Sequence, residues 1–94
     1  MTNLVWLPDA KDDLKRLHAF IKTYNTDAAN RAIQTLISAA QTLQDFPEKG
    51  HPWQPDLNFR ELPVRFGSKG YIIRYRLHEN NIVIVRVWHG LEER

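Results

Sequence analysis

The sequence predicts an α+β domain with the element order β-α-α-β-β-β, in which a helical hairpin packs on one face of an antiparallel sheet. Three observations lead to this prediction. Residues 71–77 and 82–89 are rich in β-branched and aromatic residues, a composition typical of strands, and residues 59–66 form a third strand-like run. Short turn segments separate these runs, which favours antiparallel neighbours. Before them, apolar residues recur at helical spacing in two segments.

The first half of the chain is expected to form one short strand and two helices. Residues 4–7 are apolar and precede Pro8, a residue suited to the first turn of a helix. The apolar stripe of the first helix consists of Ala10, Leu14, Leu17, Ile21 and Tyr24. The stripe of the second consists of Ala29, Ala32, Ile33, Leu36, Ile37, Ala40 and Leu43. Capping side chains at residues 25–27 lie between the two helices. The first strand would then join the sheet formed later in the chain.

Strand alternation divides the side chains of the sheet between two faces. The face toward the helices is expected to carry Leu62, Val64, Phe66, Tyr71, Ile73, Tyr75, Leu77, Val83, Val85, Val87 and His89. The opposite face is expected to carry Glu61, Arg65, Arg74, Arg76, Arg86 and Trp88. This basic face is the candidate surface for a target or partner. An alternative remains open, in which the arginines pair with carboxylates such as Glu61 and Trp88 covers apolar surface.

Length and composition limit the classes of function. Ninety-four residues are expected to form a single domain, 1–94. The chain has no cysteine, which excludes disulfides and thiolate metal sites, and it has no phosphate-loop or metal-binding motif. We therefore expect no metal and no cofactor. A net charge of +2 is mild for a dedicated nucleic-acid-binding protein.

The beginning of the sequence lacks a basic segment followed by an apolar run, so no signal peptide is expected. No apolar segment approaches the roughly 20 residues needed to cross a bilayer. These features predict a cytoplasmic protein with no membrane partner.

His89 is the one histidine with a candidate chemical role. It lies at the end of the last expected strand, and its unperturbed pKa near neutrality would suit a general base. The competing interpretation is a histidine that is hydrogen-bonded at the edge of the sheet, and this is the interpretation we favour. The sequence therefore gives no confident catalytic residue, and whether the protein is an enzyme stays open.

Several short segments carry a resemblance to a known family. They are Trp6-Leu7-Pro8 with Ala10, Asp13-Leu14, Arg60-Glu61-Leu62, the run from Gly70 to Arg76, and Val85-Arg86-Val87-Trp88-His89. Their order and spacing, with the order β-α-α-β-β-β, resemble the RelE/ParE superfamily of bacterial type II toxins. The likeness covers essentially the whole chain. It implies a toxin of a plasmid-stabilisation or toxin–antitoxin system that arrests growth and is neutralised by a cognate antitoxin.

The superfamily contains two activities, and the resemblance helps to choose between them. RelE-like members cut mRNA in the ribosome, whereas ParE-like members are similar to poisons of DNA gyrase. Where the nucleases typically carry two arginines, this chain has Ile72 and Leu91, and it also lacks their late tyrosine. Neither side chain supplies positive charge to a phosphate. These departures favour the ParE-like branch, with DNA gyrase as the expected target.

On the gyrase interpretation, the expected contact residues are Arg65, Arg74, Arg76, Arg86 and Trp88. One alternative is a ribosome-dependent mRNA interferase in which His89 is the base. Another is a non-toxic, degenerate binding module of the same fold, because toxicity depends on a few surface residues rather than on the fold.

Overall fold

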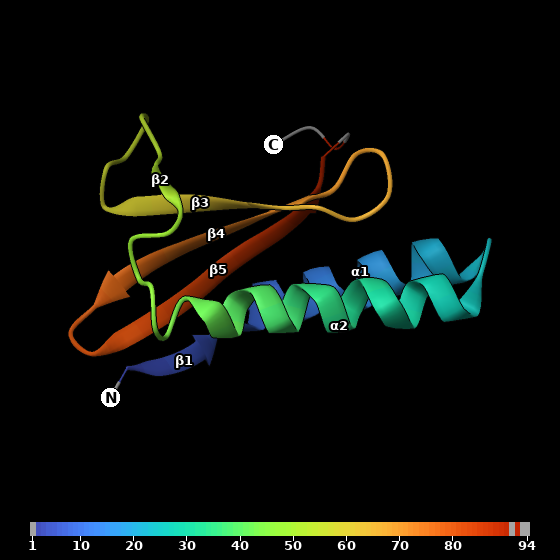
Figure 1. Ribbon diagram of the computed structural model, residues 1–94, viewed down its shortest axis with the longest axis horizontal. Coiled ribbons are helices and arrows are strands. Elements are labelled where there is room, and N and C mark those ends of the chain that lie inside the picture. Colours follow the sequence, from blue (N-terminus) through green and yellow to red (C-terminus); the bar gives the residue numbers. More distant parts are fainter. Residues whose placement is uncertain (1, 91, 93–94) are drawn as a thin grey trace.

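Two helices form a hairpin, and the apolar stripes of both helices pack into the same core. Residues 2–90 and 92 are described in the computed structural model. Helix α1 (Pro8–Lys22) starts after the extended Leu7, with a proline in its first turn. Helix α2 (Thr26–Thr42) is capped by Asn25, whose side chain accepts a hydrogen bond of 3.0 Å from the backbone N–H of Ala28. The two helices pack side by side as one layer, which lies below most of the strands in the view of Figure 1.

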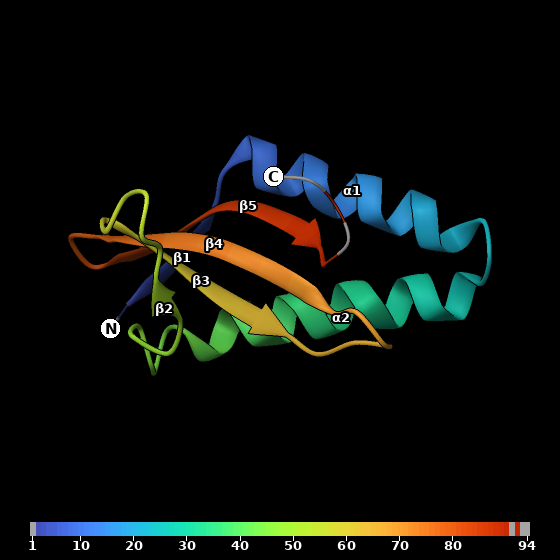
Figure 2. The same ribbon diagram turned by 90° about the horizontal axis from the view of Figure 1, so that it is seen from above.

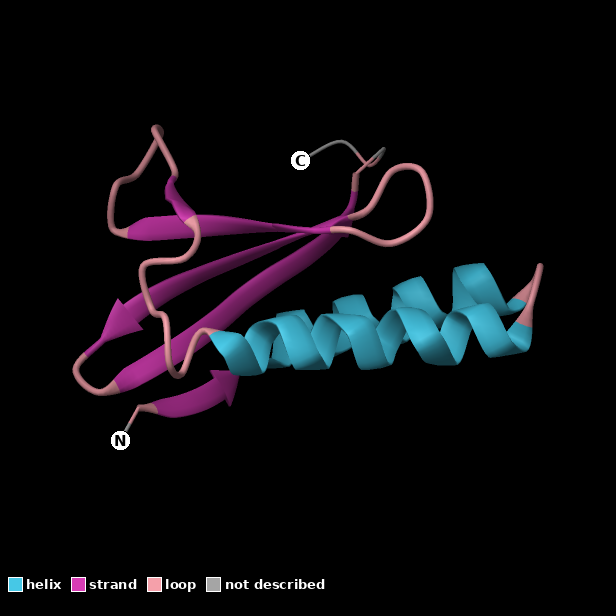
Figure 3. Cartoon of the chain, viewed as in Figure 1, coloured by secondary structure: helices cyan, strands magenta, loops and turns pink. Residues whose placement is uncertain are grey.

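Five strands form one sheet, with the order β1-β5-β4-β3-β2. The strands are β1 (Asn3–Trp6), β2 (His51–Pro52), β3 (Phe59–Val64), β4 (Tyr71–His78) and β5 (Asn81–His89). Figure 3 shows how these strands and the two helices make two layers. The predicted fold class and the two-layer arrangement are therefore confirmed.

The sheet is mixed rather than wholly antiparallel, and this corrects one detail of the prediction. The β2–β3, β3–β4 and β4–β5 pairs are antiparallel, but β1 pairs in parallel with β5. Parallel neighbours need a long crossover, which the helices and the other strands supply here. Strand β2 was not predicted. Its two residues are too few to show a period in the sequence.

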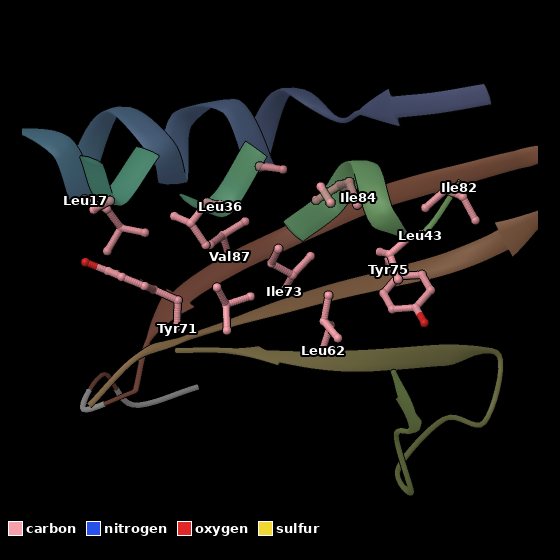
Figure 4. Close-up of a cluster of buried hydrophobic side chains, with 14 residues drawn as sticks. Leu17, Leu36, Leu43, Leu62, Tyr71, Ile73, Tyr75, Ile82, Ile84 and Val87 are labelled. Carbon is pink, nitrogen blue, oxygen red and sulfur yellow. The ribbon is translucent and has the colours of Figure 1, made fainter. Parts of the chain in front are cut away.

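The core lies between the sheet and the helices. Figure 4 shows apolar side chains from both layers meeting there, among them Leu17, Leu36 and Ile73. Tyr75 is fully buried, and its hydroxyl donates to the carbonyl of Pro47 at 2.8 Å and accepts from the N–H of Gly50 at 2.9 Å. A buried tyrosine hydroxyl thus joins the end of the helical hairpin to the sheet.

A β-bulge in the β4–β5 pair overturns part of the predicted face assignment. Arg74 lies opposite Arg86 whereas Tyr75 lies opposite Ile84, so Val85 has no partner in β4. The alternation is reversed at this point, because an extra residue shifts all later side chains to the other face. Ile82, Ile84 and Val87 are buried in the core, whereas Val83 and Val85 are only half-buried.

The end of β4 also departs from the prediction. Leu77, expected in the core, is 40% exposed. Tyr71, Ile73 and Tyr75 are buried as expected, so the error is confined to the end of β4, next to the turn that leads into β5.

Candidate functional site

Four of the five predicted contact residues lie on one face of the sheet. Arg74, Arg76, Arg86 and Trp88 alternate with the buried residues of β4 and β5, so their side chains lie on the side turned away from the helices. We call this side the outer face. It also carries Glu61 and Phe59 of β3. Arg65 follows β3 and is exposed, and it lines a hollow beside the 67–70 turn.

Arg74 is held at the centre of the outer face. Its Nε and Nη2 atoms donate to the same oxygen of Glu61, at 3.0 and 2.7 Å. The side chains are 16% and 6% exposed, respectively. The guanidinium lies 3.6 Å from the ring centre of Trp53 and 4.6 Å from that of Trp88, so it is stacked between two indoles. The positive charge of Arg74 is therefore both neutralised and covered.

Arg86 is paired in a different way, because from the outer face it reaches the edge of β5 beyond the end of β1 and meets a carboxylate of helix α1 there. Its Nε and Nη2 donate to the two oxygens of Asp13 at 2.8 and 3.1 Å. Asp13 also accepts the backbone N–H of Val87 at 2.8 Å and a contact of 3.2 Å from Arg16. Burial alone would raise the pKa of Asp13, but the hydrogen bonds from Arg86, Val87 and Arg16 outweigh burial and lower it.

The position of Asp13 follows from the length of β1. Strand β1 ends at Trp6, opposite Ile84, and α1 continues alongside the rest of β5 (Figure 2). The Val87 N–H, which would otherwise lack a ladder partner on that side, is satisfied by the Asp13 carboxylate. The sequence alone assigned no role to the Asp13 side chain. The one available signal was its place in the segment that carries the family resemblance.

Arg76 differs from its two neighbours because no described carboxylate lies within ion-pair distance of it. Its Nε atom is buried and has no hydrogen-bond partner among the residues that the structure describes. The guanidinium carbon lies 5.7 Å from the ring centre of Phe59. Arg76 lines a hollow of about 260 Å³, whose other walls are Leu7, Phe59, His78, Val83 and Val85.

His89 lies away from the arginines, at the end of β5. Its ring packs edge-on against Tyr71, with ring centres 5.4 Å apart, and its backbone N–H donates to Glu92 at 2.9 Å. Glu92 also forms an ion pair with Arg16. Burial raises the pKa of Glu92, but the hydrogen bonds from Arg16 and His89 outweigh it, so the net shift is downward. The structure thus brings His89 together with Tyr71 and Glu92, and not with Arg74 or Arg86.

Of the two positions at which the resemblance places arginines in RelE-like nucleases, only Ile72 lies within the described residues. Ile72 pairs with Trp88 and Pro63 and belongs to the outer face. Leu91 lies outside the described residues. Within the described part of the chain, no group of three or more His, Cys, Asp or Glu side chains is arranged to hold a metal ion, and no helix is long and apolar enough to cross a membrane.

Comparison with protein families decides the identity. A family model described as the ParE toxin of type II toxin–antitoxin system, parDE, matches residues 4–94. The chain belongs to the ParE toxin family. The resemblance to the RelE/ParE superfamily is thereby confirmed, and the protein is a toxin of the type II toxin–antitoxin class. Membership of this class implies an antitoxin partner.

Relatives of this ParE-family toxin carry RelE names. Toxin RelE3 of Caulobacter vibrioides is 37% identical over 87 residues, which cover 93% of this chain and 92% of the relative. Toxin RelE1 of the same organism is 36% identical over 85 residues, covering 90% of this chain and 89% of the relative. Both superfamily names therefore occur among its similar proteins, and they do not separate the two activities.

Solved structures support the fold alone. A chain described as the chromosomal ParDE TA system from P. aeruginosa superposes with a TM-score of 0.78 at 20% identity, covering 95% of this chain and 96% of that one. The Helicobacter pylori protein HP0894 gives a TM-score of 0.58 at 17% identity, with 98% of each chain covered. The two-layer arrangement is thus shared at low sequence identity.

Proposed function

We propose that this single-domain, cytoplasmic protein inhibits DNA gyrase and is neutralised by a cognate antitoxin. The observation that carries the proposal is the commitment of two arginines on the outer face. Arg74 is paired with Glu61 between two indoles, and Arg86 is paired with Asp13. A nuclease needs cationic groups that are free to meet the negative charge developing on a phosphate. These two arginines are instead paired with carboxylates of the chain itself.

The environment of Ile72 and His89 supports the same proposal. Ile72 occupies the outer-face position at which the resemblance places an arginine in RelE-like nucleases, and its side chain is apolar. His89 packs against Tyr71 and lines a hollow together with Arg16, whose guanidinium is paired with Glu92 and Asp13. A general base alone contributes about 10²–10⁴-fold to a rate. That contribution is small without stabilisation of the phosphate charge.

The target-contacting surface that we propose is the outer face and the adjoining end of β3. It includes Arg65, Arg74, Arg76, Arg86 and Trp88. Arg65 is exposed and Arg76 has no carboxylate partner among the described residues, so these two retain charge for a partner. Trp88 is 6% exposed and lies under Arg74 and Arg86, so it would act by holding them in place.

The second candidate is a ribosome-dependent mRNA interferase with His89 as its base. The observation in its favour is the RelE name of the curated relatives. The third candidate, a non-toxic binding module, keeps the fold and the antitoxin but has no target.

A supercoiling assay with purified gyrase tests the proposal. We expect the wild-type chain to block supercoiling and the His89→Ala variant to block it equally well. In cells, induction should arrest growth with filamentation and a DNA-damage response, and co-expression of the antitoxin should restore growth. Codon-dependent cleavage of ribosome-bound mRNA by the wild type, lost in His89→Ala, would replace gyrase inhibition with nuclease activity. Normal growth in cells that contain the folded protein would contradict both toxic activities and support the non-toxic binding module.

A further inference from the structure

The hollow around Arg76 on the outer face combines apolar walls with one guanidinium that has no carboxylate partner among the described residues. Leu7, Phe59, Val83 and Val85 are apolar, and the Arg76 Nε atom is buried without a hydrogen-bond partner among the described residues. Buried polar groups in folded proteins are nearly always hydrogen-bonded, and a buried donor without an acceptor costs free energy. A group that supplies an acceptor at this position would therefore be bound favourably.

We propose that this hollow receives an acidic side chain of the antitoxin, flanked by an apolar residue, with Arg76 as its ion-pair partner. The inference rests on the antitoxin partner of the proposed function and is independent of whether gyrase is the target. It assigns Arg76 a role in antitoxin binding, whereas Arg74 and Arg86 are already satisfied within the chain.

The size of the hollow favours a peptide side chain over a small molecule. Its volume of about 260 Å³ is below the range of typical ligand pockets, which begin at about 300 Å³. It is also open to the outer face rather than enclosed, because His78 on its rim is exposed. A carboxylate with one neighbouring apolar side chain fits these dimensions. The carboxylate would pair with Arg76, and the apolar side chain would pack against the apolar walls.

Charge and strand order favour the antitoxin as the source. The chain has a net charge of +2 and a pI of about 9.2, so an acidic segment is attracted to it over a distance. Strand β1 lies at one edge of the sheet, and Leu7, the residue after it, forms part of the hollow. A peptide that runs across this edge reaches Arg76 over the half-buried Val83 and Val85. An antitoxin segment bound there would cover part of the surface proposed for the target.

Affinity measurements with the full-length cognate antitoxin test this inference. The dissociation constant is measured by titration calorimetry for the wild-type toxin, Arg76→Gln and Arg76→Lys. Removing one partner of a buried charge pair weakens binding strongly, so we expect Arg76→Gln to lose at least 30-fold. Arg76→Lys should recover part of this loss, because it restores the charge without the planar guanidinium.

The matched control is Arg31→Gln on the opposite layer. Arg31 is exposed on α2, and its loss changes the net charge by the same amount. Screening at physiological salt limits such a long-range effect, so we expect less than about a threefold change. Circular dichroism of each variant confirms that the helices are retained before binding is compared.

A double-mutant cycle identifies the partner residue. Each aspartate and glutamate of the antitoxin is changed to its amide and titrated against wild-type toxin and Arg76→Gln. One acidic residue should weaken binding to the wild type and have no further effect on Arg76→Gln.

Three outcomes would overturn the inference. One is an Arg76→Gln affinity within threefold of wild type, and another is an equal loss in Arg31→Gln. The third is a loss of gyrase inhibition in Arg76→Gln with antitoxin binding unchanged, which would place the target in the hollow instead. Failure of the wild-type toxin to inhibit gyrase would contradict the proposed function only, since antitoxin affinity is measured separately.

Discussion

Arg74 and Arg76 lie two residues apart on the same strand and the same face, yet their environments are opposite. Arg74 pairs with Glu61 and lies between Trp53 and Trp88. Arg76 has a buried Nε atom with no hydrogen-bond partner among the described residues. The cause is the register with β3, which places Glu61 opposite Arg74 and Phe59 opposite Arg76. The directly opposite residue decides the environment, as cross-strand pairs generally do in sheets.

This contrast teaches that a basic face cannot be treated as a uniform charge. The sequence shows the two arginines as equivalent, because both occupy outer-face positions of the same alternating run. In the folded chain, one stabilises the sheet and the other retains an unsatisfied donor. Substitutions at the two positions should therefore have different, and even opposite, effects on stability.

The largest effect is expected from removing Arg74. The Arg74→Met variant leaves the Glu61 carboxylate buried without its ion-pair partner, which costs about 3 kcal/mol of unfolding free energy. Urea denaturation followed by circular dichroism measures this difference. The double variant Glu61→Leu, Arg74→Met should regain most of it, because no buried charge remains. A single variant as stable as wild type would show that the pair contributes nothing to the fold.

The next effect concerns the pair that joins α1 to β5. Asp13→Asn loses the charge-assisted bonds to Arg86 and should cost about 2 kcal/mol. Since the folded state lowers the pKa of Asp13, its contribution is present above the unfolded value of about 3.9 and is lost as the pH falls through the folded value. The stability of the wild type should therefore fall more steeply below about pH 4 than that of Asp13→Asn. Parallel pH profiles would contradict this.

A smaller effect is expected from opening the stack over Arg74. Trp53→Ala removes one of the two indoles and exposes the guanidinium, at a cost of about 1 kcal/mol. Trp53→Phe should retain part of this stabilisation, since it keeps an aromatic face. The comparison is made by thermal denaturation, and an alanine variant equal to the phenylalanine variant would show that stacking contributes little.

The sequence predicted the layers well because they depend on local patterns. The stripes of α1 and α2 and the buried alternation of Tyr71, Ile73 and Tyr75 all follow from spacing within one segment. The exception is Tyr24, expected in the stripe of α1, which follows the end of the helix and is 79% exposed. The bulge at Val85 could not be predicted in this way. It lies in a run of valines and isoleucines, and nothing in that run marks which residue is left unpaired. For this reason the expected core positions of Val83 and Val85 were wrong, whereas Val87 is fully buried as expected.

The candidate site was predictable only in outline. Alternation placed Arg74, Arg76, Arg86 and Trp88 on the outer face, but their partners come from distant segments. The pairing of Arg86 with Asp13 spans 73 residues, and it depends on where β1 ends. Neither the Arg86–Asp13 pairing nor the end of β1 could be derived from periodicity. The roles of these residues, and that of His89, remain predictions that the experiments above address.

The smallest effect, and the one with the opposite sign, is expected at Arg76. In the free toxin, Arg76→Met removes a buried donor that lacks an acceptor and keeps a flexible apolar side chain against Phe59, Val83 and Val85. An unsatisfied buried polar group costs about 1–3 kcal/mol, and part of the gain is offset by lost contacts of the guanidinium with Phe59. We therefore expect unfolding free energy equal to wild type or up to about 1 kcal/mol higher. Denaturation of the free chain, measured beside Arg74→Met, provides the comparison. If Arg76→Met destabilises the chain as much as Arg74→Met does, then Arg76 also stabilises the fold and the contrast between the two arginines is wrong.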